Sequence, residues 1–521
     1  MATRFLSDQK NQILIGVGLI LIVGFRMGLQ FFLYRAGFLA LTADEFGRMF
    51  LAERWANNHV IAWYGDWLPV YLVLFGSGLE VVRNMLWTPR FLVAGLGACA
   101  IVALYCLSLE LFKSKTVALL SSLLLAVSPA AIWLSSTALT EMPYSLLIIS
   151  FLTFFLAYWR STRRGYLIVS ALLLSLACGL RLEGWIITGL FCILLSGKIG
   201  LDLYQRKLRS LDLLWYGAAI LIAVIFPVLW IVGNAVHFGD PLTFFNGIKQ
   251  YKSLWYGQDR SYLNYLKTFF TLDPGVTLFA GFAFVFCLLR SPKSSSVRIY
   301  TALAFFPILI FVLLHGGQGE PAGNYIRYLA PFLFLLYPAF ACFIYFAITG
   351  LVKNVLLARV VLGLGLAVII LTQIGTTFRF KNDPAGDGIA VGKTILKLRA
   401  GAPALTDRFV VIELSYWQYL AIHMGANDTT HILYDRELDL KDRNSLSLVA
   451  TNWAAFDTCL AKYQVGFLVF KDPALRKIVE DQLKILPEKE VNGYAFYDLT
   501  RIQLPSIGQG PACPLLPGRG Y

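Results

Sequence analysis

Residues 13–50 read ILIGVGLILIVGFRMGLQFFLYRAGFLALTADEFGRMF, a long apolar segment followed by a more polar one. Its first part, residues 13–33, is long and apolar enough to cross a bilayer, which takes about 20 mainly apolar residues. Asp44 and Glu45 stand side by side soon after this segment. Two adjacent carboxylates just outside a membrane indicate either the start of a helix or a reaction site.

The composition is that of a membrane protein. Of the 521 residues, 57% are hydrophobic and 15% are charged, and the mean hydropathy is +0.65. Soluble domains are about 25% charged. The formal net charge is +14, but the lysines and arginines lie in short gaps between apolar runs rather than together on a polar face. The positive charge therefore indicates membrane topology, and no nucleic-acid partner is predicted.

The fold class predicted from these apolar runs is a polytopic α-helical membrane protein with about 11 transmembrane helices. The first apolar segment is longer than that of a signal peptide, and no A-x-A cleavage site follows it, so it is predicted to be retained. The predicted spans are residues 13–33, 91–112, 117–134, 144–159, 166–180, 184–195, 213–236, 276–289, 299–314, 326–348 and 360–378.

Basic residues indicate the orientation. With the N-terminus in the cytoplasm, the cytoplasmic segments hold 16 lysines and arginines, whereas the short outer gaps hold one, Arg181. Positive residues favour the cytoplasmic side. The sequence thus predicts an integral protein of the plasma (inner) membrane with a cytoplasmic N-terminus. An odd number of spans then makes the C-terminal tail extracytoplasmic.

Two domains are predicted. Residues 1–379 form the transmembrane domain, with outer-face loops 34–90 and 237–275 whose aromatic residues suit the membrane surface. Residues 380–521 begin with the linker KNDPAGDG and form a small soluble α/β domain. In it RFVVIELSYWQYLAIHMG reads as strand and helix, and VGFLVF, DPALRKIVEDQL and YAFYDL read as strand, helix and strand. Cys459 and Cys513 lie in this tail, and whether they pair is left open.

Asp44 and Glu45 also have a purely structural interpretation. Thr42 followed three residues later by Glu45 fits a capping box, in which both side chains bind free N–H groups at the start of a helix. Capping explains Glu45 better than it explains Asp44.

Three other charged residues are predicted at the outer ends of spans. Glu141 is the only charge in SSTALTEMPY, Arg181 lies in the hairpin ACGLRLEGW beside Glu183, and Arg327 enters a span in RYLAPF. Two of them have structural alternatives: an acid at a helix start for Glu141, and a local ion pair or an arginine that reaches the surface for Arg181. Lipid offers Arg327 no solvation at that depth, however, and such a residue is functional by default.

The predicted topology therefore gathers acidic and basic groups on one membrane face. Guanidinium groups match a phosphate through their forked donors, and a nearby carboxylate can accept a proton from a nucleophile. This combination suits a lipid phosphate as leaving group and a hydroxyl group as acceptor.

The chain resembles the multi-spanning C-type glycosyltransferases over about its first 380 residues. Within them it is similar to the protein O-mannosyltransferases and lipid A aminoarabinose transferases (glycosyltransferase family 39-like). The segments that carry the resemblance are Arg26 in the first span followed by Asp44 and Glu45, Glu141 in the second outer loop, GLRLEG with Arg181, FGDPL at 238–242, and RYLAPF with Arg327.

The resemblance implies an enzyme that transfers a sugar from a polyprenyl-phosphate donor to a protein, lipid or glycan acceptor, with inversion at the anomeric carbon. It implies Asp44 as general base, Glu45 and Glu141 on the acceptor side, and Arg181 and Arg327 as ligands of the donor phosphate. The family often has lysine at the position of Arg181, which keeps the charge but changes the geometry.

Three alternatives stay open. A divalent metal could be bound by Asp44, Glu45 and Glu141, as in some relatives, although two arginines already neutralise the phosphate, so no cofactor is predicted with certainty. A transporter or flippase of lipid-linked glycans would also need many spans and basic residues, but its charges usually lie near the membrane midplane. A third alternative is a scaffold subunit that keeps the fold without turnover.

Overall fold

The structure, a computed structural model, describes all residues except 1, 62–66, 249–273, 291–293, 316–321, 402–406, 416, 437–445, 503–512 and 516–521. For residues 2–11, 274–280, 290, 315 and 322–326 it describes the backbone. Most of the aromatic loop predicted at 237–275 therefore lies outside the described residues. The chain divides into two compact units, which are Met1–Phe38, Ile61–Tyr71 and Arg90–Phe380, and Leu39–Val60, Leu72–Pro89 and Lys381–Tyr521.

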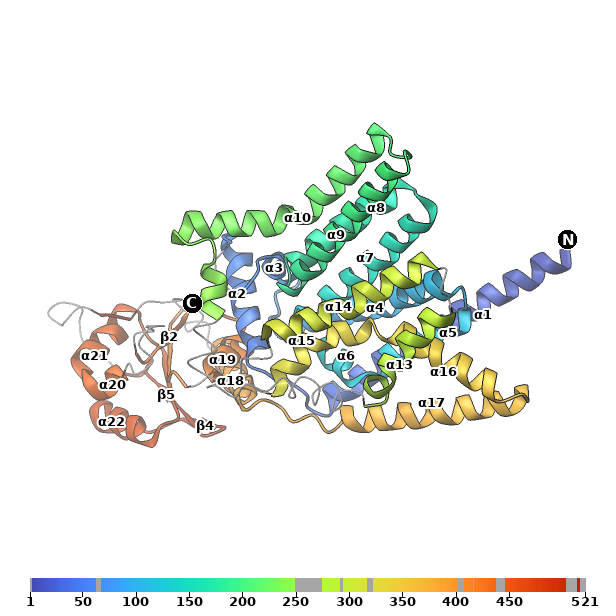
Figure 1. The fold of residues 1–521 in the computed structure, drawn as a ribbon. Coiled ribbons are helices and arrows are strands. Elements are labelled where there is room, and N and C mark those ends of the chain that lie inside the picture. Colours follow the sequence, from blue (N-terminus) through green and yellow to red (C-terminus); the bar gives the residue numbers. More distant parts are fainter. Residues whose placement is uncertain are drawn as a thin grey trace. The chain divides into compact units, whose positions relative to one another are not determined.

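The first unit is helical (Figure 1). Within it α8 packs against both α7 and α10, and α5 packs against α1 and α16. Its helices are α1 (Ala2–Arg35), α4 (Thr88–Phe112), α5 (Lys115–Val127), α6 (Pro129–Leu134), α7 (Glu141–Ser161), α8 (Arg164–Cys178), α9 (Glu183–Tyr204), α10 (Ser210–Phe238), α13 (Pro274–Arg290), α14 (Ser295–His315), α15 (Ala322–Phe334), α16 (Tyr337–Leu351) and α17 (Val355–Thr377).

Seven helices in the described part of the chain are long and apolar enough to cross a membrane. The bent pair Arg327–Phe334 and Tyr337–Leu351, with 48° between its halves, makes an eighth if it is one span. The predicted fold class, a polytopic α-helical membrane protein with a small C-terminal α/β region, is confirmed. The seven are Gln12–Arg35, Thr88–Phe112, Glu141–Ser161, Glu183–Tyr204, Ser210–Phe238, Ser295–Leu314 and Val355–Thr377.

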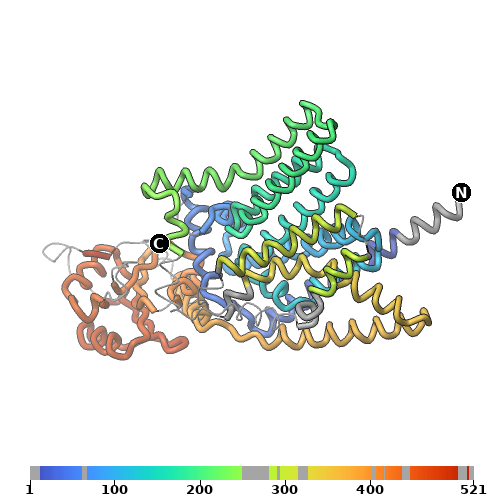
Figure 2. Tube along the Cα trace, viewed as in Figure 1, coloured from blue at the N-terminus to red at the C-terminus, as the bar shows by residue number. Residues whose placement is uncertain are grey.

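The remaining predicted spans are shorter helices. The segment 117–134 is divided because the side chain of Ser128 caps α6 and Pro129 begins it. Helix α8 has 15 residues, so it is about 22 Å long, less than the hydrocarbon thickness of a bilayer. The segment 276–289 is α13, with 17 residues. Helix α10 spans 29 residues with Pro227 inside it, and it changes direction midway (Figure 2).

The second unit contains a five-stranded sheet of order β2-β1-β3-β5-β4. Strand β1 is parallel to β2 and β3, and β5 is antiparallel to β3 and β4. The predicted strands and helices of RFVVIELSYWQYLAIHMG, VGFLVF, DPALRKIVEDQL and YAFYDL are present. The elements are α2 (Asp44–Asn58), the larger part of α3 (Val70–Val81), η1 (Pro384–Asp387), α18 (Gly388–Gly401), β1 (Val410–Ile412), α19 (Gln418–Ala426), β2 (Ile432–Tyr434), α20 (Leu448–Thr451), α21 (Trp453–Lys462), β3 (Phe467–Phe470), α22 (Pro473–Leu483), β4 (Lys489–Val491) and β5 (Tyr494–Asp498).

The sheet is covered by helices on both faces. Val411 and Leu468 pack with Phe456 of α21 and Val479 of α22 in one buried core. Helices α18 and α19 lie on the other side of the strands (Figure 1). They cross closely because each has a glycine at the contact: a Cβ atom at Gly392 would lie 2.1 Å from the main-chain oxygen of Ile422.

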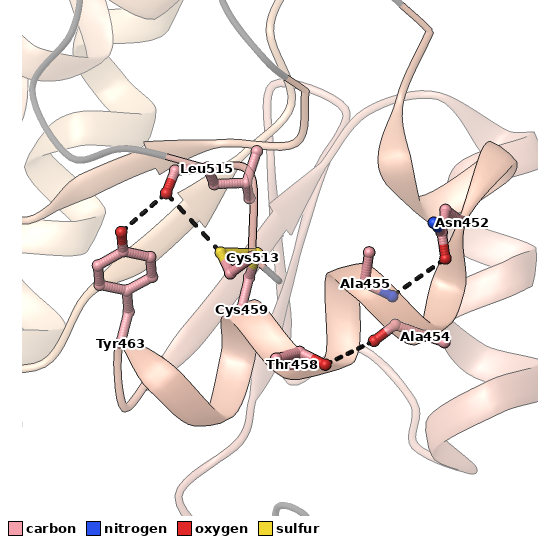
Figure 3. The surroundings of a disulfide bond; sticks show 8 residues. All are labelled: Asn452, Ala454, Ala455, Thr458, Cys459, Tyr463, Cys513 and Leu515. Carbon is pink, nitrogen blue, oxygen red and sulfur yellow. Dashed lines mark hydrogen bonds between the residues drawn. A yellow bond between two sulfur atoms is a disulfide. The ribbon is translucent and has the colours of Figure 1, made fainter. Parts of the chain in front are cut away.

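A disulfide bond joins Cys459 of α21 to Cys513 in the C-terminal segment (Figure 3). Beside it the Tyr463 hydroxyl donates to the main-chain oxygen of Leu515 at 2.7 Å. Both contacts fix residues 513–515 against the core of the second unit. The pairing that the sequence leaves open is thus present in the structure.

Candidate active site

The segment that leads into α7 is held by α1. The guanidinium of Arg26 donates to the main-chain oxygens of Ala126, at 2.9 Å, and Ala131, and to the hydroxyl of Ser135. Arg26 is buried, so its charge is stabilised by these oxygens at the ends of α5 and α6 rather than by solvent. The arginine thereby fixes the turn from which the chain enters α7 at Glu141.

The turn between α8 and α9 carries a local ion pair. The Nε and Nη2 atoms of Arg181 donate to the two carboxylate oxygens of Glu183, at 3.1 and 2.6 Å. Such a two-bond fork fixes the plane of the guanidinium. The Trp185 indole donates to the main-chain oxygen of Cys178 at 3.2 Å across the same turn, and its ring contacts Phe244 edge to face. The position of Arg181 is therefore set from its own hairpin.

Arg181 and Arg327 meet at Glu141. The Oε1 atom of Glu141 accepts a hydrogen bond from Nη1 of Arg181 at 2.6 Å and from Nε of Arg327 at 2.8 Å. Glu141 is fully buried, and the arginines are 6% and 2% exposed. The structure thus brings together three of the five predicted site residues. With Glu183 they form a group of four buried charges, which we call the ion cluster.

The charges of the ion cluster cancel, with two guanidinium groups against two carboxylates. Burial alone would lower the pKa of Arg181, but the Glu183 and Glu141 carboxylates raise it, and the net shift is upward. The ring of Tyr328 also lies under this guanidinium, 5.2 Å from its carbon. Arg181 therefore stays charged. Glu141 receives two charged donors on one oxygen and thereby orients the arginines.

Asp44 and Glu45 belong to the second unit, at the start of α2. The Oε1 atom of Glu45 accepts from the main-chain N–H groups of Leu41 and Thr42, at 3.2 and 3.3 Å. This is one half of a capping box. The other half is missing, since Ala43 is the N-cap residue and no side chain caps the helix there. Glu45 is buried by this arrangement, whereas Asp44 is partly exposed.

A further carboxylate, Asp383, lies within electrostatic reach of Asp44. Burial raises the pKa of Asp383, the N–H group of Ala385 lowers it, and the charge of Asp44 raises it. The main-chain N–H of Asp383 donates to the oxygen of Ala40 at 2.8 Å, so its segment is attached to the turn before α2. Nothing in the sequence points to this neighbour, because an Asp-Pro pair indicates only a turn.

The predicted carboxylates do not form a set of side chains that could bind a metal. Within the described ranges, no three side chains of His, Cys, Asp or Glu are arranged to hold an ion. The Oε1 atom of Glu141 accepts hydrogen bonds from two arginines, and that of Glu45 accepts hydrogen bonds from the backbone. Both carboxylates thus serve protein contacts, and we derive no step from a metal.

Over most of the chain the protein has the fold of the C-type glycosyltransferases, which the resemblance in the sequence predicts for about the first 380 residues. ArnT of Cupriavidus metallidurans bound to undecaprenyl phosphate is similar with a TM-score of 0.61 and 15% identity, over 92% of this chain and 97% of that chain. Its apo structure has a TM-score of 0.61 and 13% identity over the same shares.

A second glycosyltransferase of this fold is also similar. The archaeal oligosaccharyltransferase AglB of Archaeoglobus fulgidus, in complex with an inhibitory peptide and a dolichol-phosphate, has a TM-score of 0.54 and 14% identity, over 88% of this chain and 70% of that chain. No protein-family model matches the sequence, and no curated protein matches it. At these identities the comparisons establish the fold, and the reaction has to be argued from the residues.

Proposed function

We propose that the protein is an inverting glycosyltransferase that moves a sugar from a polyprenyl-phosphate donor to an acceptor on the extracytoplasmic face. The observation that carries the proposal is the ion cluster, because it places two guanidinium groups on one buried carboxylate at the start of α7. The similar ArnT structure holds undecaprenyl phosphate, and the AglB complex holds a dolichol-phosphate and a peptide. Both ligands support a lipid-linked phosphate as the donor.

Arg181 and Arg327 are the proposed ligands of the donor phosphate. The described residues accept three of the five N–H groups of Arg181, which leaves two for a ligand. A phosphate bound there is stabilised by donors that Glu141 and Glu183 already hold in place, so little side-chain entropy is lost on binding. The same donors stabilise the negative charge that grows on the phosphate as the sugar leaves.

The proposed reaction is a single displacement. The acceptor oxygen forms a bond to the anomeric carbon from the side opposite the phosphate, and the bond between that carbon and the phosphate oxygen breaks with both electrons on the phosphate. Asp44, the general base that the resemblance implies, accepts the acceptor's proton. One displacement gives inversion.

Two observations favour the extracytoplasmic side for the second unit. The cytoplasmic segments predicted from the sequence are rich in basic residues, and the Cys459–Cys513 disulfide suits an oxidising compartment. A polyprenyl phosphate anchored in the bilayer would then present its sugar at the outer ends of the helices.

The test is an assay of sugar transfer from a labelled polyprenyl-phosphate sugar by the purified protein in lipid nanodiscs. Asp44→Asn should lower transfer by roughly a hundredfold or more, because the base contributes about 10²–10⁴. Asp481→Asn is the matched control, since Asp481 is exposed on α22. Full transfer by Asp44→Asn would remove that residue from the mechanism. Movement of labelled lipid across vesicles without transfer would instead support the flippase alternative.

A further inference from the structure

The hydroxyl of Tyr144, buried in the first unit, makes no hydrogen bond to the part of the chain that the structure describes. Tyr144 is 1% exposed. A buried hydroxyl left without a partner destabilises a fold, because water would have bonded it. Phenylalanine would fill the same space without this cost. Packing alone therefore does not explain a tyrosine here.

The position of Tyr144 points to a ligand at the ion cluster. It follows Glu141 by three residues on α7, so both side chains lie on one face of the helix. Glu183 and Arg181 act electrostatically on its hydroxyl. The hydroxyl thus lies within electrostatic reach of the two residues that define the hairpin side of the cluster.

Other donors at the same place are also unused. The hydroxyl of Thr140, which precedes Glu141 and is fully buried, has no partner among the described residues. Arg181 keeps one N–H on Nη1 and one on Nη2 beyond its bonds to the glutamates. Buried donors without acceptors, next to fixed guanidinium groups, fit a ligand rich in acceptor oxygens. A phosphate oxyanion has this chemistry.

We propose that the Tyr144 hydroxyl donates a hydrogen bond to a phosphate oxyanion bound at the ion cluster. This rests on the function proposed above and adds a neutral donor to the two arginines. The ligand is either the headgroup of a polyprenyl phosphate or free phosphate, and both accept the same bond.

The experiment compares Tyr144→Phe with the unchanged full-length protein in nanodiscs, by binding of a polyprenyl phosphate, of the uncharged polyprenol, and of inorganic phosphate. The Kd for polyprenyl phosphate should rise roughly tenfold to a hundredfold, the range for a hydrogen bond to a charged group. The Kd for polyprenol should not change. The melting temperature should stay the same or rise, since the variant removes an unpaired buried group.

Tyr300→Phe is the matched control. Tyr300 is equally buried, but its hydroxyl donates to the main-chain oxygen of Leu335 in the break between α15 and α16. Its removal should lower the melting temperature and leave both affinities unchanged. A weaker affinity of Tyr144→Phe for inorganic phosphate as well supports contact with the oxyanion itself, and weakening with the lipid alone supports a headgroup that its chain holds in place.

Three outcomes would overturn the inference. One is an unchanged Kd for polyprenyl phosphate in Tyr144→Phe. Another is an equal loss of affinity for polyprenol, which would mean that the hydroxyl contacts the chain. The third is a lower melting temperature with unchanged affinities, as expected for a structural hydroxyl. If the unchanged protein fails to bind polyprenyl phosphate, the proposed donor site is contradicted as well. The transfer assay of Asp44→Asn measures turnover, so its result does not depend on the role of Tyr144.

Discussion

At the scale of single residues, His423 makes the second unit sensitive to pH. It is fully buried, with Nδ1 at 2.7 Å from the main-chain oxygen of Asp428 and Nε2 at 2.8 Å from the Tyr434 hydroxyl. Burial lowers its pKa to about 4, against the smaller opposing effects of Asp428 and Glu53; Arg399 lowers it further. In the unfolded chain the pKa of histidine is about 6.5.

The sign of the pH effect follows from these two values. At pH values between these two pKa values, His423 is protonated in the unfolded chain but not in the folded chain, so stability falls as the pH falls. The contribution of His423 is fully present above pH 6.5 and is lost as the pH falls through about 4, by about 3 kcal/mol in total. We expect the melting temperature of the purified protein to fall over this window.

The variant His423→Asn isolates this contribution. It should show a shallower dependence of melting temperature on pH than the unchanged protein, whatever its own stability. His59→Asn serves as control, because the His59 side chain is 64% exposed and pairs with Glu80 at the surface. Identical pH slopes in all three proteins would show that His423 does not titrate in this window.

The types of residue in the sequence predicted much of the candidate site, but the sequence did not show which of these residues lie close together. Glu141, Arg181 and Arg327 stand out in the sequence because each is a charge at the end of an apolar run. Their meeting on one oxygen is invisible there, since 186 positions separate Glu141 from Arg327. Tyr144 gives even less signal, because an aromatic residue in an apolar helix reads as packing. It is marked only by its hydroxyl, which has no partner among the residues that the structure describes.

At the scale of elements, the crossing of α18 and α19 should tolerate no side chain at its glycines. A Cβ atom at Gly392 would lie 2.1 Å from the main-chain oxygen of Ile422, and one at Gly425 would lie 2.3 Å from that of Ile389. Since the obstacles are backbone atoms, one helix has to shift. We expect Gly392→Ala to destabilise the second unit by about 1–3 kcal/mol, as measured by its unfolding in denaturant.

The control for this prediction is Gly401→Ala at the end of the same helix. No atom of the described residues lies within 4 Å of a Cβ atom there. Alanine also favours the helix by up to about 1 kcal/mol relative to glycine. Gly401→Ala should therefore be neutral or stabilising, and equal effects of the two variants would mean that the crossing is not tight.

Whether a segment is a helix or a strand was easier to predict from the sequence than the residues at which it begins and ends. Long apolar runs such as α4 and α17 follow from hydropathy, because a run of more than 20 apolar residues has few other solutions. The division of 117–134 depends on Ser128 and Pro129, whose capping bond hydropathy cannot register. Strands β2 and β4 have three residues each, too few for alternation to be recognised.

At the scale of the whole molecule, the second unit gathers segments that are distant in sequence. Asn427 of α19 accepts from the N–H of Met85 and donates to the main-chain oxygen of Arg83, each at 2.9 Å. The Thr429 hydroxyl donates to Glu53, which also binds Arg83 at 3.0 Å. The bonds of Asn427 and Thr429 join residues 53–85 to the C-terminal region across more than 340 positions. Local sequence patterns carry no information at that range.

The Cys459–Cys513 disulfide tests the orientation of the whole chain. The other six cysteines are free and lie in the apolar helices of the first unit. In right-side-out vesicles, a membrane-impermeant reductant followed by an impermeant maleimide should label the protein if the C-terminal unit is extracytoplasmic, and the double variant Cys459→Ser/Cys513→Ser should take up no label. Closing a loop of 54 residues stabilises a fold by about 4 kcal/mol in the chain-entropy model, so reduction should also lower the melting temperature. Labelling that requires permeabilised membranes would place the disulfide on the cytoplasmic side. The second unit, with Asp44, could not then meet an acceptor outside the cell.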